Sequence, residues 1–180
     1  MSEILTPRLR LRRARTQDLD AIHAVLGNAQ AMRYWSTPPH DGLDQTRAWL
    51  ADMIAAPAQT SDDYVVERQG QVIGKAGCWR IPEVGFILHP DHWGQGLARE
   101  ALTAVIGRVF ASFPIASLEA DVDPRNLASL RLLGRLRFEE TGRARRTWKV
   151  GEVWCDSVYL ALPRSRASFT GTGPDRGAGP

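Results

Sequence analysis

The sequence predicts an α/β domain in which a mixed, mostly antiparallel sheet of about seven strands is flanked by helices. Three observations lead to this prediction. Short alternating or β-branched runs recur along the chain, stretches with helical periodicity lie between them, and a length of 180 residues suits one core. We expect a single domain over 1–162, followed over 163–180 by a disordered tail that is rich in Gly, Pro, Ser and Thr.

The first expected elements are one strand and two helices. Arg8–Arg13 reads RLRLRR, and this alternation is typical of a strand. Thr16 precedes apolar residues at helical spacing that end near Gly27, so we expect the threonine hydroxyl to cap the first helix. A second helix is predicted over about 44–54, between a Pro-Pro-His-Asp-Gly turn and Pro57.

Three strands in series come next and predict an antiparallel meander. The runs 64–68 and 72–79 are rich in β-branched residues, and they flank a Gln-Gly-Gln turn whose glycine tolerates the positive φ of a tight hairpin. A third run, 84–88, follows Pro82.

The second half of the chain alternates helices with strands. A glycine-rich turn at 93–96 opens directly into a helix with a continuous apolar stripe. The elements expected after that helix are a strand at 118–122, a helix at 126–136, and two strands near 138–143 and 153–162.

The composition excludes several classes of protein. The net charge is +3, but 23 Lys and Arg are interleaved with 20 Asp and Glu, which leaves no concentrated basic face for nucleic acid. No apolar run has the length of a membrane span or a signal peptide. The two cysteines lack the paired spacing of a zinc or redox site. We expect a cytoplasmic protein without metal, contacting neither nucleic acid nor membrane.

The turn before the third helix is the first candidate site. Gly94 and Gly96 precede the helix start, where several backbone N–H groups have no helical partner and the helix dipole is positive. Such a turn binds anions, most often phosphate. The alternative is that the glycines only make a tight turn from strand to helix. The segment is neither a Walker loop nor a dinucleotide fingerprint.

The second candidate site lies at the start of the fourth helix. Asn126 is a good N-cap residue, and Ser129 and Leu133 fall on nearly the same helix face. A polar pair above an apolar residue suits an amide-bearing, partly apolar arm of a ligand. The alternative is that Asn126 only caps the helix and Ser129 is a surface hydroxyl.

Together, the segments HWGQGLAREA and NLASLRLLGRLRF resemble the Gcn5-related N-acetyltransferase (GNAT) superfamily. The resemblance extends from Leu5 to about Leu162. More narrowly, the chain is similar to the ribosomal-protein N-terminal acetyltransferases, in which a tryptophan before the Gly-x-Gly turn is usual. The resemblance implies the GNAT fold, with the sheet splayed between the fourth and fifth strands, and the cofactor acetyl-CoA, released as CoA.

The resemblance also implies which residues bind the cofactor. The pyrophosphate is expected on the backbone amides of the turn, the pantetheine arm along the edge of the fourth strand, and the late Asn-x-x-Ser pair beside the arm and its sulfur. The expected contacts are Phe86, Ile87, Leu88, Trp93, Gly94, Gln95, Gly96, Leu97, Ala98, Arg99, Asn126, Ser129 and Leu133.

The sequence departs from the family pattern in two places. Trp93 stands where the wider superfamily has Gln or Arg, which matters little when main-chain amides bind the ligand. Arg137 replaces the usual glycine after the fourth helix, so we expect it to disfavour a left-handed helix stop. Arg135 is a candidate to reach a coenzyme phosphate, and the alternative is that its side chain is only solvated.

Acetyl transfer to an amine needs a base, an oxyanion donor and a proton for the thiolate. Glu83, just before the fourth strand, is the candidate base, with His89 and His92 as alternatives. A backbone N–H near Ile87 and Leu88 is the candidate oxyanion donor, and Ser129 is the candidate to protonate the thiolate. Cys78 lies in an apolar strand without a histidine partner, so direct transfer in a ternary complex is preferred.

The acceptor is poorly specified by the sequence. Tyr34, Trp35 and Trp154 are the candidate substrate-binding residues, and Asp41 and Asp156 are weaker candidates to attract an amine. The expected partner is a primary amine, either a protein N-terminus or a small molecule, and the protein is expected to be a monomer or homodimer. Alternative functions are small-amine detoxification (polyamine, aminoglycoside or amino acid) and a non-catalytic acyl-CoA-binding module.

Overall fold

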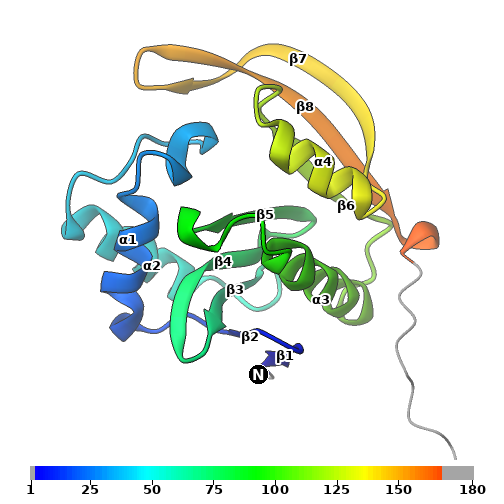
Figure 1. The fold of residues 1–180 in the computed structure, drawn as a ribbon. Coiled ribbons are helices and arrows are strands. Elements are labelled where there is room, and N and C mark those ends of the chain that lie inside the picture. The colour runs from blue at the N-terminus through cyan, green and yellow to red at the C-terminus, as the bar shows by residue number, and fades with distance from the viewer. Residues whose placement is uncertain (1–2, 168–180) are drawn as a thin grey trace, which may run out of the picture.

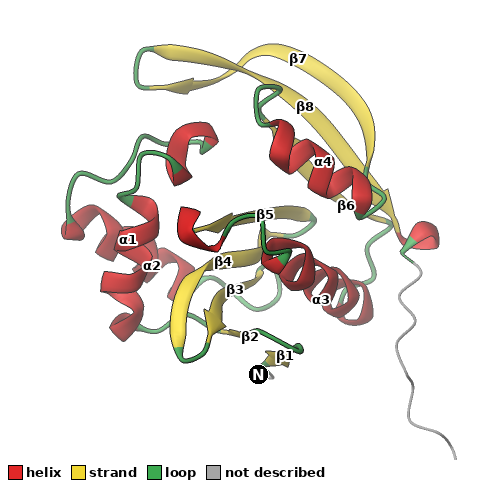
Figure 2. Cartoon of the chain, in the orientation of Figure 1, coloured by secondary structure: helices red, strands yellow, loops and turns green. Residues whose placement is uncertain are grey.

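The computed structural model describes residues 3–167 as one mixed sheet flanked by helices (Figures 1 and 2). Within these residues the sheet has eight strands in the order β1-β2-β3-β4-β5-β6-β8-β7. Every pairing is antiparallel except β5 with β6. The predicted fold class is confirmed, and the strand beyond the expected seven is the two-residue β1 at the N-terminal end.

The elements follow the predicted order, with short 3-10 turns added. The strands are β1 Ile4–Leu5, β2 Arg10–Arg12, β3 Asp62–Arg68, β4 Gln71–Arg80, β5 Glu83–Leu88, β6 Ser117–Val122, β7 Glu139–Val150 and β8 Val153–Pro163. The α-helices are α1 Leu19–Leu26, α2 Leu43–Ala55, α3 Leu97–Ser112 and α4 Leu127–Arg135. The 3-10 helices are η1 Thr16–Asp18, η2 Ala31–Tyr34, η3 Pro90–His92 and η4 Arg164–Arg166.

Two details near the N-terminus and the first hairpin have clear local causes. Thr16 does not cap α1 as expected. It begins η1, and the capping acceptor is the Asp18 carboxylate, which takes the Arg15 backbone N–H at 2.7 Å. The β3–β4 hairpin is confirmed, and its turn has φ of 51° at Gln69 and 82° at Gly70. Positive φ at both central residues is the requirement of a type I′ turn.

The sheet is splayed where β5 meets β6. These strands form a single parallel pair, Glu83 with Glu119, supported by the Glu119 N–H bonding the Pro82 carbonyl at 3.0 Å. β5 and β6 are the fourth and fifth strands of the predicted order, so the splay lies where the resemblance implies. In Figure 1 the β6–β8 half lies at the top with α4, and β1–β5 lie below.

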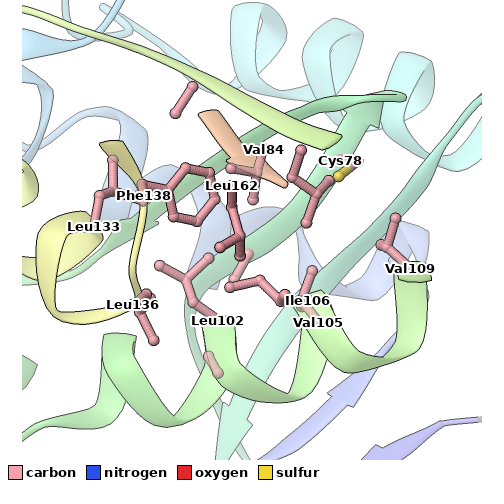
Figure 3. Packing of buried hydrophobic residues seen from close by; sticks show 14 of the residues in the cluster. Cys78, Val84, Leu102, Val105, Ile106, Val109, Leu133, Leu136, Phe138 and Leu162 are labelled. Carbon is pink, nitrogen blue, oxygen red and sulfur yellow. The ribbon is translucent and has the colours of Figure 1, made fainter. Parts of the chain in front are cut away.

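Two apolar clusters hold the sheet and its helices together. The larger cluster joins the inner face of α3 to both halves of the sheet, and Figure 3 shows Leu102 and Ile106 of α3 pointing toward Phe138 and Leu162. The smaller cluster joins α1, η2 and α2 to β3 and β5. Since side chains from both half-sheets share the larger cluster, packing rather than strand pairing bridges the splay.

The end of α4 corrects one prediction. Arg137 adopts a φ of 68°, so the left-handed stop forms although the residue is not glycine. The Phe138 N–H bonds the Leu133 carbonyl and the Arg137 N–H bonds the Gly134 carbonyl, both at 3.0 Å, which is a Schellman motif. The left-handed conformation of Arg137 costs about 1 kcal/mol. Burial of the Phe138 side chain stabilises the fold by about 2 kcal/mol, which is enough to offset that cost.

The described structure continues past the expected domain end at 162. Pro163 ends β8, and the Arg164 guanidinium donates to the carbonyls of Phe110 and Ile115 at 2.6 and 2.9 Å and to that of Phe113. The rest of the predicted tail, 168–180, lies outside the described residues. Within the described part of the chain, no helix combines the length and apolarity needed to cross a membrane.

Candidate functional site

The glycine turn presents unpaired backbone amides at the start of α3. Gly94 and Gly96 have φ of 71° and 75°, and Gly96 is the N-cap residue with no side-chain cap. The first helical bond of α3 runs from the Glu100 N–H to the Gly96 carbonyl. The N–H groups of Leu97, Ala98 and Arg99, at the start of this 16-residue helix, therefore have no acceptor among the described residues.

The surroundings of this turn fit a phosphate-bearing cofactor. A Cβ built on Gly94 would meet nothing within 4 Å, so the turn is open to a ligand. Arg8, from the β1–β2 connection, and Arg68, from the end of β3, both hydrogen-bond Gln95, and exposed Arg99 follows in the helix. Sequence reasoning found Arg99 but missed Arg8 and Arg68, because each lies far from the turn along the chain.

Trp93 links the turn to the end of β5. Its indole Nε1 donates to the Leu88 carbonyl at 2.8 Å, although the side chain is largely exposed. Of the two alternative bases in this segment, His89 accepts the Asp91 N–H through Nδ1 at 3.4 Å. Burial, together with nearby Arg68, lowers the pKa of His92, and neither histidine lines the cavity described below.

The open edge of β5 is made by alternate residues. The His89 N–H bonds the Ile73 carbonyl of β4. Because bonding alternates along an antiparallel ladder, the backbone groups of Ile87 also face β4, opposite Lys75. The backbone groups of Phe86 and Leu88 face the other way, toward the splay. The Ile87 side chain is buried in the smaller cluster. Phe86 and Leu88 therefore remain suited to a ligand arm, and Ile87 does not.

The start of α4 has one predicted residue in an unexpected position. Asn126 caps the helix, with its Oδ1 accepting the Ser129 N–H at 3.1 Å, and Ser129 is partly exposed. Leu133 is only 1% exposed and belongs to the larger core cluster. Since its side chain offers no surface to a ligand, we drop Leu133 from the proposed cofactor contacts.

A cavity of about 720 Å³ opens at the other end of β5. Its walls come from η2, α2, β3, β4, the starts of β5 and of β8, and the ends of β6 and β7. Glu83, Tyr34, Trp35 and Asp156 line it as expected of an acceptor site, and Asp41 does not. Lining residues that the sequence did not single out include Trp49, Asp52, Trp79, Asp121 and Trp148.

Trp154 is replaced by Trp148 as the aromatic residue of the β7–β8 hairpin in the cavity. Val153 and Cys155 line the cavity, and strand alternation turns Trp154 between them away, where the Arg146 guanidinium lies 5.1 Å from its ring centroid. The Trp148 Nε1 instead donates to Asp121 Oδ2 at 2.9 Å, which joins the hairpin to β6. Trp154 therefore does not share the cavity with Tyr34 and Trp35.

The cavity is acidic within a basic protein. Six carboxylates and three cationic side chains line it. Two carboxylates are neutralised there, Asp63 by Lys75 at 2.8 Å and Asp123 by Arg125. Although burial acts to raise it, hydrogen bonds from Arg125 hold the pKa of Asp123 below its ordinary value. The other four carboxylates are Asp52, Glu83, Asp121 and Asp156, and of these Glu83 lies 3.4 Å from exposed Arg80.

Cys78 adds no nucleophile to this arrangement. Cys78 is fully buried, and burial raises the pKa of its thiol to about 12, which keeps it protonated. Among residues 3–167, no group of three or more His, Cys, Asp or Glu is arranged to hold a metal ion.

The two parts of the site lie at opposite ends of β5. Glu83, Val84 and Gly85 at its start line the cavity, and Leu88 at its end is tied to the glycine turn through Trp93. Six residues of extended strand span roughly 17 Å. A splayed mixed sheet with an amide turn at one end of a strand and a separate acidic cavity at the other fits the class of N-acyltransferases that the sequence resemblance implies.

Within this class, the chain belongs to the GNAT family. Residues 8–139 match the family described as "Acetyltransferase (GNAT) domain". The protein is an acetyl-CoA-dependent N-acetyltransferase.

Individual relatives differ in what their names report. The chain is 29% identical over 154 residues to an uncharacterized N-acetyltransferase, p20, from Bacillus licheniformis, covering 81% of this chain and 86% of that one. Spermidine N-acetyltransferase from Vibrio cholerae, in complex with CoA and spermine, has a TM-score of 0.77 at 21% identity, covering 90% and 99%. The Salmonella typhimurium enzyme that modifies the N-terminal serine of ribosomal protein L7/L12 has a TM-score of 0.80 at 20% identity, covering 90% and 99%.

Proposed function

We propose that the protein transfers the acetyl group of acetyl-CoA to a primary amine of a small acceptor that carries more than one positive charge. The observation that supports this proposal is the cavity beside Glu83, in which carboxylates outnumber cations and aromatic rings form the walls. Ammonium groups are attracted both by carboxylates and by the faces of Trp and Tyr. A neutral acceptor would bring no positive charge to balance this excess of carboxylates.

We assign the cofactor to the turn and the open edge of β5. The pyrophosphate would be held by the amides from Gly94 to Ala98, and the pantetheine arm would lie along Phe86 and Leu88 toward Asn126 and Ser129. When bound, acetyl-CoA supplies the acetyl thioester. Free amides at the end of α3 and open space at Gly94 support this assignment.

We assign the proton transfers to two side chains. The Glu83 carboxylate would take a proton from the acceptor ammonium, because a charged nitrogen has no lone pair with which to attack. The Ser129 hydroxyl would donate a proton toward the departing sulfur. A backbone N–H of the open β5 edge, at Phe86 or Leu88, would donate to the carbonyl oxygen of the thioester.

The candidate acceptors differ in the number of positive charges that they bring to the cavity. A protein N-terminus offers a single ammonium and would leave several cavity carboxylates unmatched, whereas a polyamine or aminoglycoside matches them. The structural neighbours include both kinds of enzyme, since one is a spermidine N-acetyltransferase and one modifies a protein N-terminus. No observation favours a non-catalytic acyl-CoA-binding module over an enzyme.

The proposal is tested by thiol release from acetyl-CoA with a matched panel of amines. The panel contains a polyamine, an aminoglycoside, a free amino acid and a peptide with a free N-terminus. We expect the first two to have the highest kcat/KM, by about tenfold or more. Turnover confined to the peptide or the amino acid would contradict the proposed acceptor class while leaving the enzyme class intact.

A further inference from the structure

Arg8 is bonded to both the glycine turn and α3. Its guanidinium Nη1 donates to the Gln95 carbonyl at 2.8 Å, and its Nε donates to Glu100 Oε2 at 2.6 Å. The third nitrogen, Nη2, has no hydrogen bond to the described residues and lies 3.6 Å from where a Cβ on Gly96 would stand. The side chain is 46% exposed, so this free nitrogen sits beside the turn and within reach of a ligand.

Arg68 reaches the same turn residue from another element. Its Nη1 donates to Gln95 Oε1 at 2.7 Å, and the Gln95 side-chain amide in turn donates to the Asp91 carbonyl at 3.0 Å. Gln95 is thus fixed through its main chain by Arg8 and through its side chain by Arg68. Two cations therefore stand at the residue that lies between the two glycines.

Glu100 locks Arg8 in this position. Its carboxylate accepts the Thr6 hydroxyl at 2.6 Å and the Arg8 backbone N–H at 2.8 Å in addition to the Arg8 side chain. Although burial acts to raise the pKa of Glu100, these bonds hold it below its ordinary value. The guanidinium is thereby oriented before any ligand arrives, which reduces the entropy cost of using it in binding.

We propose that Arg8 and Arg68 bind the phosphates of CoA, holding the turn through Gln95 and presenting their free guanidinium nitrogens to the anion. The proposal rests on the proposed cofactor assignment. Arginine forms short, charge-assisted hydrogen bonds to phosphate oxygens, and each such bond contributes more than a neutral one. Backbone amides alone supply only the partial charge of the helix end.

The first test is calorimetric titration with CoA at low and high salt. Arg68→Gln is expected to raise the Kd for CoA about tenfold at low salt, and to weaken the dependence of Kd on salt, because one ionic contact is lost. The matched control is Arg143→Gln, which removes the same charge from an exposed ion pair with Glu140 on β7. This control should bind CoA as the wild type does.

Arg8 requires a paired substitution. Removing Arg8 alone would leave the Glu100 carboxylate partly buried without its cation, so the double variant Arg8→Gln with Glu100→Gln removes both charges together. It should also raise the Kd for CoA about tenfold, with a melting temperature close to that of wild type. If the double variant does not fold, Arg68→Gln still decides the proposal.

Cofactor fragments separate a charge role from a merely structural one. With acetyl-pantetheine, which has no phosphate, both variants should keep wild-type kcat/KM. With 3′-dephospho-CoA, an unchanged tenfold loss would identify the pyrophosphate as the partner, and a loss confined to CoA would identify the 3′-phosphate. An equal loss with acetyl-pantetheine, or unchanged binding of CoA, would overturn the proposal. Failure of wild type to bind CoA would instead overturn the cofactor assignment.

Discussion

The two ends of β5 are built in different ways. At its C-terminal end the groups proposed to face the cofactor are backbone amides of one short turn, with Arg8 and Arg68 bonded to it. At its N-terminal end they are carboxylates and aromatic rings from eight separate elements. The turn depends on chain conformation and so tolerates change in most side chains, whereas the cavity depends on the side chains themselves. The difference explains how relatives of one fold can keep one cofactor and differ in acceptor.

Among these substitutions, Gly96→Glu is expected to weaken cofactor binding the most. The new carboxylate would stand near Arg8 Nη2, in the space proposed for phosphate, and the positive φ of 75° adds a backbone cost of about 1 kcal/mol. We expect the Kd for CoA to rise at least about 100-fold by calorimetry, since a like charge opposes the ligand directly.

The matched control for that substitution is Gly151→Glu. Gly151 also has a positive φ, 58°, and open space around it, but it lies in the β7–β8 turn. It should carry the same backbone cost and leave CoA binding unchanged. Equal loss in both variants would mean that general destabilisation, and not phosphate repulsion, causes the effect.

Glu83→Gln tests the chemistry where the cavity meets the strand. The amide cannot take a proton, so kcat is expected to fall about 100-fold while the KM for acetyl-CoA stays the same. The deficit should shrink as the pH rises, because more of the acceptor amine is then already neutral. Steady-state thiol release across pH 6 to 10 measures both effects.

Glu119→Gln is the control for Glu83. Glu119 is the residue paired with Glu83 across the splay, yet it does not line the cavity. It should retain kcat. A Glu83→Gln enzyme with wild-type turnover would remove the carboxylate from the proposed mechanism.

The smallest expected effect is that of Asp121→Asn on acceptor binding. The asparagine keeps an oxygen for the Trp148 Nε1 but loses the charge. We expect the KM for a polyamine to rise about fivefold, which corresponds to about 1 kcal/mol, with the KM for acetyl-CoA unchanged. Asp41→Asn, outside the cavity, is the control. A similar rise in KM in that variant would mean that the change in the protein's net charge, and not the loss of a carboxylate in the cavity, causes the effect.

The same contrast explains what the sequence could predict. The order of elements and the glycine turn follow from residues that are neighbours in the chain, so local pattern and a short motif suffice, whereas the splay was implied by the family resemblance. Arg8 and Arg68 were missed because they reach Gln95 across 87 and 27 positions of sequence. No local pattern distinguishes such an arginine from a solvated one.

The cavity was predicted least well for a related reason. Its aromatic residues sit on strands and helices whose facing is set by register, and a β-bulge between Ala144 and Trp148 changes the register of β7 against β8. Sequence pattern alone therefore does not reveal that Trp148 lines the cavity and Trp154 does not. Arg137 shows the converse, since tertiary packing of Phe138 overrides a local preference for glycine.

The charge separation along β5 has a consequence for how the substrates arrive. The donor is anionic and the proposed acceptor cationic, so each is drawn to a different end of the strand and repelled from the other. Such focusing raises association rates by about 10 to 10³ at low ionic strength and fades beyond a Debye length of about 8 Å at physiological salt. With the proposed acceptor, both molecules would be sorted by electrostatic steering before contact, without a moving part, and added salt would slow both encounters while leaving the transfer step itself unchanged.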